Sequence, residues 1–448
     1  MPKLRRPSGG LWANRDFVKL WSGQSISEFG SQISALAIPL LAATQLHASP
    51  LAFSLLAVLG FLPFILFALP AGVWVDRLRR RPILIFGDAG RAVLLTLVPV
   101  LWATHTLRMW HLLVLQFAIG IFTVFFDVAY QSYLPSLVER GDLVEGNAKL
   151  QTTASAAQTT GPPLAGVLVA ALTAPYAIAL DAVSFIVSTA FMIPIRTLES
   201  LPERAPEAAK PKMWPELKEG VRYVVGHRYL KWIALSTGAS NFFGQIAFAI
   251  VILYMQRSLH MSAIAIGVVF AGFGAGAIVA SITATRFTRL VGGIGNAIWM
   301  PAVVFSLGGL TFPLAPRSLP IPVLLTGTIL VGYGGMAYNI AQVSLRQAIT
   351  PERLQGRMNA SMRWIVWGTI PLGTLVGGAL ATAYGLRAAL WVGAIGSLFT
   401  FLPLLLSSVR SLEELPAAAT ESAPAESAAG IVEPTTSPLA GAFPSDAA

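Results

Sequence analysis

The sequence contains no cysteine and few charged residues. Without a thiol, the chain cannot form a disulfide, a thiolate metal site or a cysteine nucleophile. Charged residues make up 12% of its 448 residues, which is about half the share usual in a soluble globular domain. The patterns HExxH, GxSxG and GxxxxGKS are also missing. These absences argue against a zinc, serine-hydrolase or nucleotide-hydrolysing enzyme, and we expect no cofactor other than an ion gradient.

Hydrophobic residues make up 55% of the chain and occur in long runs with few or no charges. A helix that crosses the hydrocarbon core of a bilayer needs about 20 apolar residues. Lipid offers no hydrogen-bond partners, so a spanning backbone must satisfy its own polar groups. The pattern predicts an all-α membrane protein with twelve spans, at 17–46, 50–75, 82–104, 109–137, 143–172, 176–195, 231–256, 262–285, 293–315, 320–347, 356–384 and 386–409.

The net charge of +10 could indicate a nucleic-acid partner, but its distribution argues against one. Only four basic residues fall in the loops on one side of the predicted spans, namely Arg108, Arg257, Arg317 and Arg387. Basic residues concentrate on the cytoplasmic side of membrane proteins. We therefore expect a multi-pass protein of the cytoplasmic membrane with both termini in the cytoplasm. The basic residues 1–17 lack the apolar core and cleavage site of a signal peptide.

A polar loop at 196–230 divides the predicted spans into two groups of six. We expect an N-terminal bundle at 1–195, a cytoplasmic linker, a C-terminal bundle at 231–410 and a disordered tail at 411–448. The tail has six acidic and no basic residues and cannot form a core. Within the linker, apolar residues at helical spacing predict an amphipathic helix on the membrane surface: Trp214, Leu217, Val221 and Val224.

A weak internal repeat relates the two groups of spans at an offset of 212 residues. It aligns Asn147 with Asn359 and Asp127 with Asn339, among others. Paired bundles of this kind are expected of transporters that rock two halves around a central site.

Polar residues between the second and third predicted spans form a short cluster. The stretch GVWVDRLRRRP contains Gly72, Asp76, Arg77, Arg80 and Arg81. It resembles the cytoplasmic signature of the major facilitator superfamily, although Arg79 stands where that signature often has a second glycine. The resemblance implies a latch in which Asp76 meets the start of the eleventh span, near Arg357, and closes the cytoplasmic face.

Three longer segments are similar to the branch of that superfamily that exports drugs, macrolides and siderophores. They are Asn14–Leu41, Ser132–Leu150 and Leu345–Trp364. The stretch TTGPPLAG, with Gly161, Pro162 and Gly166, resembles the antiporter signature, in which small residues let helices pack closely and proline bends them. The resemblance implies a secondary exporter of small amphipathic molecules, driven by proton antiport and alternating access, and acting as a monomer.

Charges within the spans are candidates for function because they are costly in a bilayer. Two acids, Glu28 and Asp127, are the proton-coupling candidates, since burial of a carboxyl group favours its neutral form. The alternative is that either acid pairs with Arg91 or Arg363 and only holds helices together. Asp88 and Arg91 are three residues apart and are expected to form a local pair.

Polar residues at helical spacing form stripes in four spans. In the resembled family, spans 1, 4, 7 and 10 line a central cavity, which implies the following substrate-cavity candidates: Gln24, Gln32, Gln131, Asn241, Gln245, Tyr338, Asn339 and Gln342. The substrate itself is left open. Two alternatives also remain: a proton-coupled importer, and a receptor or scaffold without transport.

Overall fold

The computed structural model describes residues 10–75, 77–197, 199 and 213–414, and all regular elements in these ranges are helical. They are η1 (Gly10–Ala13), α1 (Arg15–Thr44), α2 (Pro50–Val75), α3 (Arg80–Ala103), α4 (Met109–Leu137), η2 (Arg140–Asp142), α5 (Leu143–Leu172), α6 (Ala174–Met192), α7 (Met213–Gly226), α8 (Leu230–Arg257), α9 (Ala263–Leu290), α10 (Ile294–Leu314), α11 (Pro320–Ile349), α12 (Glu352–Trp367), α13 (Thr369–Tyr384), α14 (Leu386–Ser397) and α15 (Leu402–Leu405).

Twelve of these segments span the membrane, as predicted. Eleven segments have the length and hydropathy expected of a membrane span. In this count α12 and α13 together form one span, and α14 and α15 together form another. The twelfth is α5, which has 30 residues but carries the polar stretch before Pro162. Much of α5 packs against α1 and α9, while Gln151, Thr152, Gln158 and Thr160 of its polar stretch are exposed. The chain is therefore an all-α, multi-pass membrane protein.

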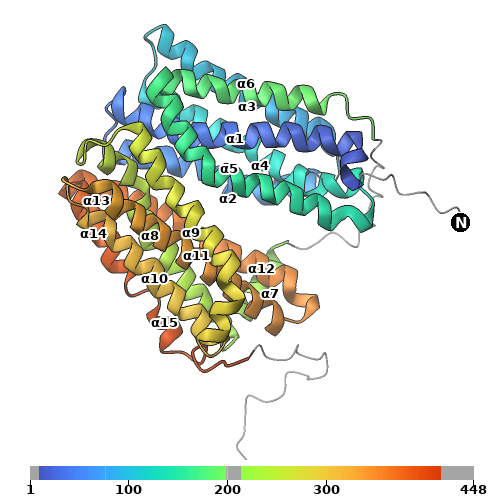
Figure 1. Ribbon diagram of the computed structural model, residues 1–448. Helices are drawn as coiled ribbons and strands as arrows, with labels where there is room; N and C mark the ends of the chain where they lie inside the picture. Colours follow the sequence, from blue (N-terminus) through green and yellow to red (C-terminus); the bar gives the residue numbers. More distant parts are fainter. Residues whose placement is uncertain (1–9, 76, 198, 200–212, 415–448) are drawn as a thin grey trace, which may run out of the picture.

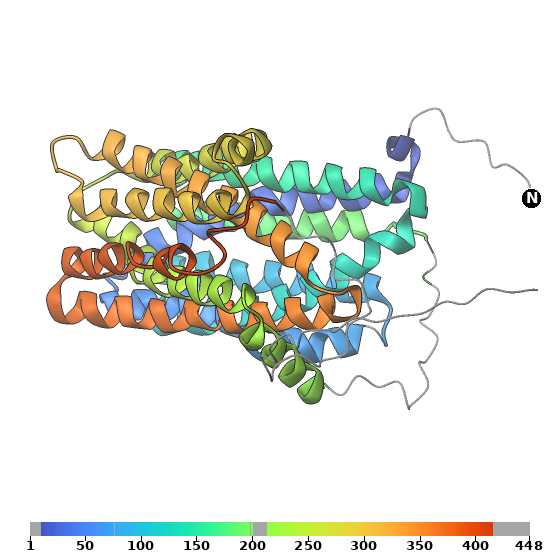
Figure 2. The ribbon, with the colours of Figure 1, turned by 90° about the horizontal axis from the view of Figure 1, so that it is seen from below.

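The helices form two bundles, with α1–α6 in one half and α8–α15 in the other (Figure 1). Seen from below, the long helices lie along a common direction (Figure 2). We call the end of the molecule at which α1 begins the proximal end, and the end at which α1 is followed by α2 the distal end. The bundles diverge toward the proximal end (Figure 1).

The two halves meet along their distal parts, where α5 packs against α9 and α2 against α13. A Cβ atom on Gly166 would lie 2.5 Å from the carbonyl oxygen of Ala263, at the distal start of α9. Small residues at these positions let the helices approach closely. The distal end of the structure is therefore closed.

The predicted amphipathic helix in the linker corresponds to α7, at Met213–Gly226. It packs against α12 of the C-terminal half, where a Cβ atom on Gly220 would lie 2.5 Å from the carbonyl oxygen of Arg357. Val224 is fully buried. Part of the apolar face of α7 is thus covered by the C-terminal half. The periodicity of the sequence did not predict this contact. The side chains of Trp214 and Leu217, most of the linker before them and the tail from 415 onward lie outside the described residues.

Candidate transport pathway

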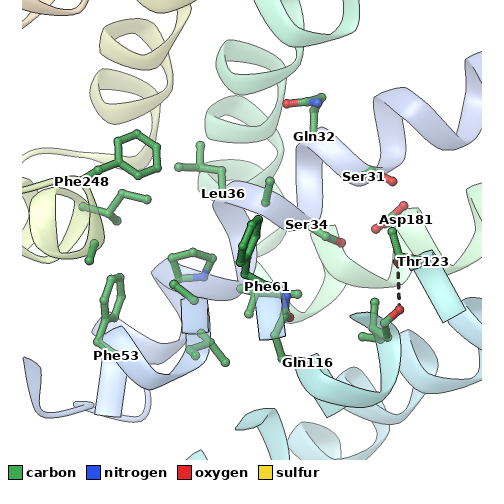
Figure 3. Close-up of a pocket in the computed structure, with 18 of the residues that line it drawn as sticks. Ser31, Gln32, Ser34, Leu36, Phe53, Phe61, Gln116, Thr123, Asp181 and Phe248 are labelled. Carbon is green, nitrogen blue, oxygen red and sulfur yellow. Dashed lines mark hydrogen bonds between the residues drawn. The ribbon is translucent and has the colours of Figure 1, made fainter. Parts of the chain in front are cut away.

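A cavity of about 610 Å³ lies between the two halves. Figure 3 shows Phe53 and Phe61 of α2 and Phe248 of α8 around it. Most of the lining is apolar, which suits a site that holds an apolar or amphipathic molecule. The polar and charged lining residues are few: Ser31, Gln32, Ser34, Arg91, Gln116, Thr123, Asp181, Gln245 and Thr374.

Two charged residues that line this cavity were not among the predicted cavity residues. Asp181 of α6 is 1% exposed, and its carboxylate accepts a hydrogen bond of 3.0 Å from Ser184. Arg91 of α3 is the other. Asp181 is the single charge of α6, and Arg91 lies one turn from Asp88 in an otherwise apolar part of α3, so neither belongs to a polar stripe. Their position inside a predicted span was the only signal for them.

Asp88 and Arg91 form an ion pair, as predicted from their spacing. Asp88 is fully buried and also accepts a hydrogen bond of 2.6 Å from Ser188 of α6. The Arg91 guanidinium lies 4.2 Å from the ring centre of Phe126 and 4.3 Å from that of Phe185. Because Asp88 already compensates its charge, Arg91 is part of a network that joins α3 to α4 and α6.

A second cavity of about 460 Å³ lies within the N-terminal half, and we call it the acidic pocket. It brings together four of the predicted residues from α1 and α4: Gln24, Glu28, Asp127 and Gln131. Gln24 and Gln32 lie one helical turn on either side of Glu28 in α1. Among the described residues neither carboxylate forms an ion pair. The alternative, in which either acid forms an ion pair with Arg91 or Arg363 and only holds helices together, is therefore not seen among the described residues.

A third cavity of about 420 Å³ lies within the C-terminal half, and we call it the basic pocket. It contains four more of the predicted residues: Asn241, Tyr338, Asn339 and Gln342. The Tyr338 hydroxyl lies 2.5 Å from that of Thr237, and Asn241 donates to the carbonyl oxygen of Val366 at 3.0 Å. The predicted candidates are thus divided among three cavities, since Gln32 and Gln245 line the central one.

The segment between α2 and α3 is held by the end of the N-terminal half. The Glu199 carboxylate accepts hydrogen bonds from the backbone amides of Arg80 and Arg81, at 2.7 and 2.8 Å. The Arg81 guanidinium donates to the carbonyl oxygens of Met192 and Ile193 at the end of α6. These contacts cap the start of α3, where a helix dipole favours a carboxylate.

The predicted latch stays a prediction. Asp76 lies outside the described residues, so its partner is not observed. Arg77 is exposed, and a Cβ atom on Gly72 would meet open space. Arg357 forms an ion pair with Glu219 of α7 at 2.6 Å. In this conformation Arg357 thus contributes to the contact between α7 and α12.

The glycine and proline motif of α5 lies at two helix contacts. A Cβ atom on Gly161 would lie 2.4 Å from the side chain of Gln32 in α1. One on Gly267 of α9 would lie 2.4 Å from the carbonyl oxygen of Pro162. Pro162 and Gly166 thus belong to the α5–α9 part of the seam between the halves, whereas Gly161 packs within the N-terminal half.

Comparison with known proteins gives the family. The family model for transmembrane secretion effectors matches residues 11–440. Macrolide efflux protein A of Streptococcus pyogenes is 23% identical over 406 residues, covering 89% of this chain and 97% of that protein. The multidrug efflux pump Tap of Mycolicibacterium fortuitum is 26% identical over 399 residues, covering 84% and 93%. An uncharacterised transporter of Bacillus subtilis, YfiS, is 27% identical over 210 residues, and the match spans 47% of this chain and 49% of that protein.

Solved structures show the same fold at low sequence identity. A bacterial homologue of the iron transporter ferroportin, in its inward-facing state, superposes with a TM-score of 0.66 and 17% identity, covering 88% of this chain and 98% of that one. The nucleoside transporter NupG superposes with a TM-score of 0.69 and 12% identity, covering 87% and 98%. With the two six-helix bundles described above, the family match establishes that this chain is a membrane transporter, not an enzyme, and that it belongs to the transmembrane secretion effectors of the major facilitator superfamily.

Proposed function

We propose that this transporter exports small amphipathic molecules from the cytoplasm by proton antiport. It works as a monomer in the inner membrane, with its proximal end and both termini on the cytoplasmic side. The positive residues in the proximal loops support this orientation. The relatives named as macrolide and multidrug efflux proteins support export and the substrate class.

One observation carries the proton coupling. Glu28 of α1 and Asp127 of α4 face the same pocket, and among the described residues neither has an ion-pair partner. Without a cationic partner, a carboxyl group inside a membrane protein is a candidate proton carrier.

The arrangement of the halves supports alternating access. They are packed together distally and diverge proximally, which is the arrangement expected of a transporter whose central cavity opens to the proximal side. Opening toward the distal side then requires α5 to separate from α9, and α2 from α13. The mainly apolar cavity fits a solute that is itself largely apolar with a few polar groups.

The test is transport in proteoliposomes driven by an imposed pH gradient, with a macrolide as the first solute. We expect Glu28→Gln to abolish gradient-driven transport, with Asp127→Asn reducing it or abolishing it. Glu145→Gln is the matched control, because Glu145 is an acid near the proximal end that pairs with Lys149.

The outcomes separate the alternatives. Wild-type transport in the same direction as the protons would establish an importer. If a broad solute panel caused no proton flux, a receptor or scaffold would be favoured. Unchanged pH-driven transport in both acid variants would remove the two carboxyl groups from the mechanism.

A further inference from the structure

The acidic and basic pockets are equivalent positions in the two halves. At the repeat offset of 212 residues, α4 aligns with α11, and α5 aligns with α12 and α13. Several lining residues of the acidic pocket then fall on lining residues of the basic pocket: Asp127 on Asn339, Tyr130 on Gln342, Leu134 on Arg346 and Gln151 on Arg363. The two halves thus build one kind of pocket twice.

The charges of the two pockets are opposite. Asp127 is replaced by the neutral Asn339 in the C-terminal half. Conversely, Leu134 and Gln151 are replaced by the cations Arg346 and Arg363. The whole stretch from 231 to 410 contains a single acid, Glu352, which precedes the pocket residues of α12. A shared packing role does not explain the two arginines, since the N-terminal half has the neutral Leu134 and Gln151 at the equivalent pocket positions.

Arg346 is held by neutral groups. Its guanidinium donates to Gln342 at 3.1 Å and to Asn359 at 2.6 Å. Its Nε atom is buried and has no hydrogen-bond partner among the described residues. Both acceptors are amides, so no described carboxylate compensates the positive charge. Arg346 is partly buried in the last turn of α11, and an anionic ligand in the pocket would supply the counter-charge that this cation lacks among the described residues.

Arg363 adds a second charge next to an aromatic surface. It lines the same pocket as Arg346, and its guanidinium lies 4.4 Å from the ring centre of Trp367. Phe305 and Trp367 complete an apolar wall. Arginine is the side chain best suited to carboxylate and phosphate groups, which it binds through two parallel N–H donors.

We propose that the basic pocket binds the anionic group of an aromatic or amphipathic organic acid, with Arg346 and Arg363 as its charge partners. This assignment rests on the proposed transport function and adds organic anions to its substrates. The acidic pocket then handles protons in one half while the solute's anionic group binds in the other. A lipid phosphate has the same chemistry, and the experiment must distinguish it.

The test is a binding measurement without any gradient. Purified protein in phosphatidylcholine nanodiscs is titrated calorimetrically with 2-naphthoate and with the neutral 2-naphthamide. We expect wild type to prefer the anion. We expect Arg346→Gln and Arg363→Gln to weaken naphthoate binding about tenfold or more, and to leave naphthamide binding unchanged. Arg363→Gln installs the residue found at the equivalent position 151.

Arg286→Gln is the control, since Arg286 is exposed near the proximal end of α9 and outside the pocket. Thermal unfolding of each variant checks that it is folded, and Arg346→Lys keeps the charge if the glutamine variant is not. Equal affinity for naphthoate and naphthamide would overturn the proposal, as would naphthoate binding that is unaffected by both substitutions.

A lipid occupant is tested in nanodiscs that also contain phosphatidylglycerol. If wild type retains phosphatidylglycerol that naphthoate does not displace and that Arg363→Gln loses, the occupant is a lipid headgroup and the solute assignment is wrong. Because binding needs no proton gradient, this result is independent of Glu28→Gln. If naphthoate did not bind while proton-driven transport was intact, only the proposed anion site would be wrong. If naphthoate bound as expected while Glu28→Gln left proton-driven transport unchanged, only the proposed proton coupling would be wrong.

Discussion

Arg257 donates a hydrogen bond of 2.9 Å to the carbonyl oxygen of Ala48. Arg257 ends α8 in the C-terminal half, and Ala48 lies in the distal connection between α1 and α2 in the N-terminal half. A second bond of 3.3 Å goes from the same guanidinium nitrogen to the carbonyl oxygen of Ala43. One side chain thereby ties the two halves together at the closed distal end.

We predict that Arg257→Gln weakens the distal closure by about 1–3 kcal/mol, because a charged donor to two carbonyl groups is lost. The chain has no cysteine, so spin labels can be attached specifically at Thr104→Cys and Ser318→Cys. Double electron–electron resonance then measures the distance between the two labels at the distal end. We expect a larger fraction of molecules with a long distance between the two labels. Arg317→Gln is the control, since Arg317 donates to the carbonyl oxygen of Ser258 within its own half. An unchanged distance distribution would show that Arg257 does not stabilise the closed end.

We predict that Gly267→Ala also opens the seam between the halves. The added methyl group would lie 2.4 Å from the carbonyl oxygen of Pro162, which is backbone and cannot rotate away. Overpacking of this kind costs about 1–3 kcal/mol. The closed conformation should lose stability, seen as a longer distal distance with the same two labels and a lower thermal unfolding midpoint.

Gly309→Ala provides the matched control for this substitution. Gly309 also lies inside a helix, but a Cβ atom there would meet nothing within 4 Å. Alanine should stabilise that helix by about 0.5–1 kcal/mol, because glycine loses more backbone entropy on folding. If both variants behaved alike, the close contact between α5 and α9 would not be what holds the seam.

Apolar periodicity predicted most of the architecture. The segments 50–75, 109–137 and 143–172 were predicted with the bounds that the helices have. The span predicted at 356–384 is instead interrupted at Gly368, and that at 386–409 is interrupted after Ser397. The break at Gly368 has a local cause, because glycine is a weak helix former and Pro371 cannot donate the helical hydrogen bond to Trp367. Apolar periodicity alone did not reveal it, since the apolar pattern continues across the break.

The candidate site was predicted residue by residue but not as an arrangement. Spacing identified Glu28 and Asp127 separately, because each lies in a polar stripe of its own helix. Only the packing of α1 beside α4 shows that they share a pocket. The repeat aligned Asp127 with Asn339, yet the opposite charge of the two pockets became visible only when Arg346 and Arg363 were found to line the same space.

We predict that Asp88→Asn is strongly destabilising. Arg91 would remain buried, at 7% exposure, without its counter-ion, and removal of one partner of a buried pair costs about 3–5 kcal/mol. The double variant Asp88→Leu with Arg91→Met should recover much of this loss, because no charge is left unpaired. The yield of monodisperse protein and the thermal unfolding midpoint measure both effects. Equal stability of Asp88→Asn and wild type would contradict the pair's structural role.

His227 should make the junction between α7 and α8 sensitive to pH. Its Nδ1 atom accepts hydrogen bonds from the backbone amides of Tyr229 and Leu230, at 3.2 and 3.5 Å. Burial, and then the positive charge of Arg228, lower the pKa of His227 below its ordinary value. The folded chain thus binds a proton here less readily than the unfolded chain. The contribution of neutral His227 to the free energy of unfolding is therefore fully present above a pH of about 6.5. It is lost as the pH falls below that value.

We predict that hydrogen exchange at the amides of Tyr229 and Leu230 accelerates between pH 7 and pH 5, after correction for the intrinsic rate, as protonated His227 can no longer accept their bonds. His227→Asn should remove this dependence, because asparagine offers an acceptor that does not titrate in this range. His47→Asn is the control, since His47 lies at the distal end, far along the chain from this junction. If the acceleration persisted in His227→Asn, another group would be responsible for the loosening of the junction.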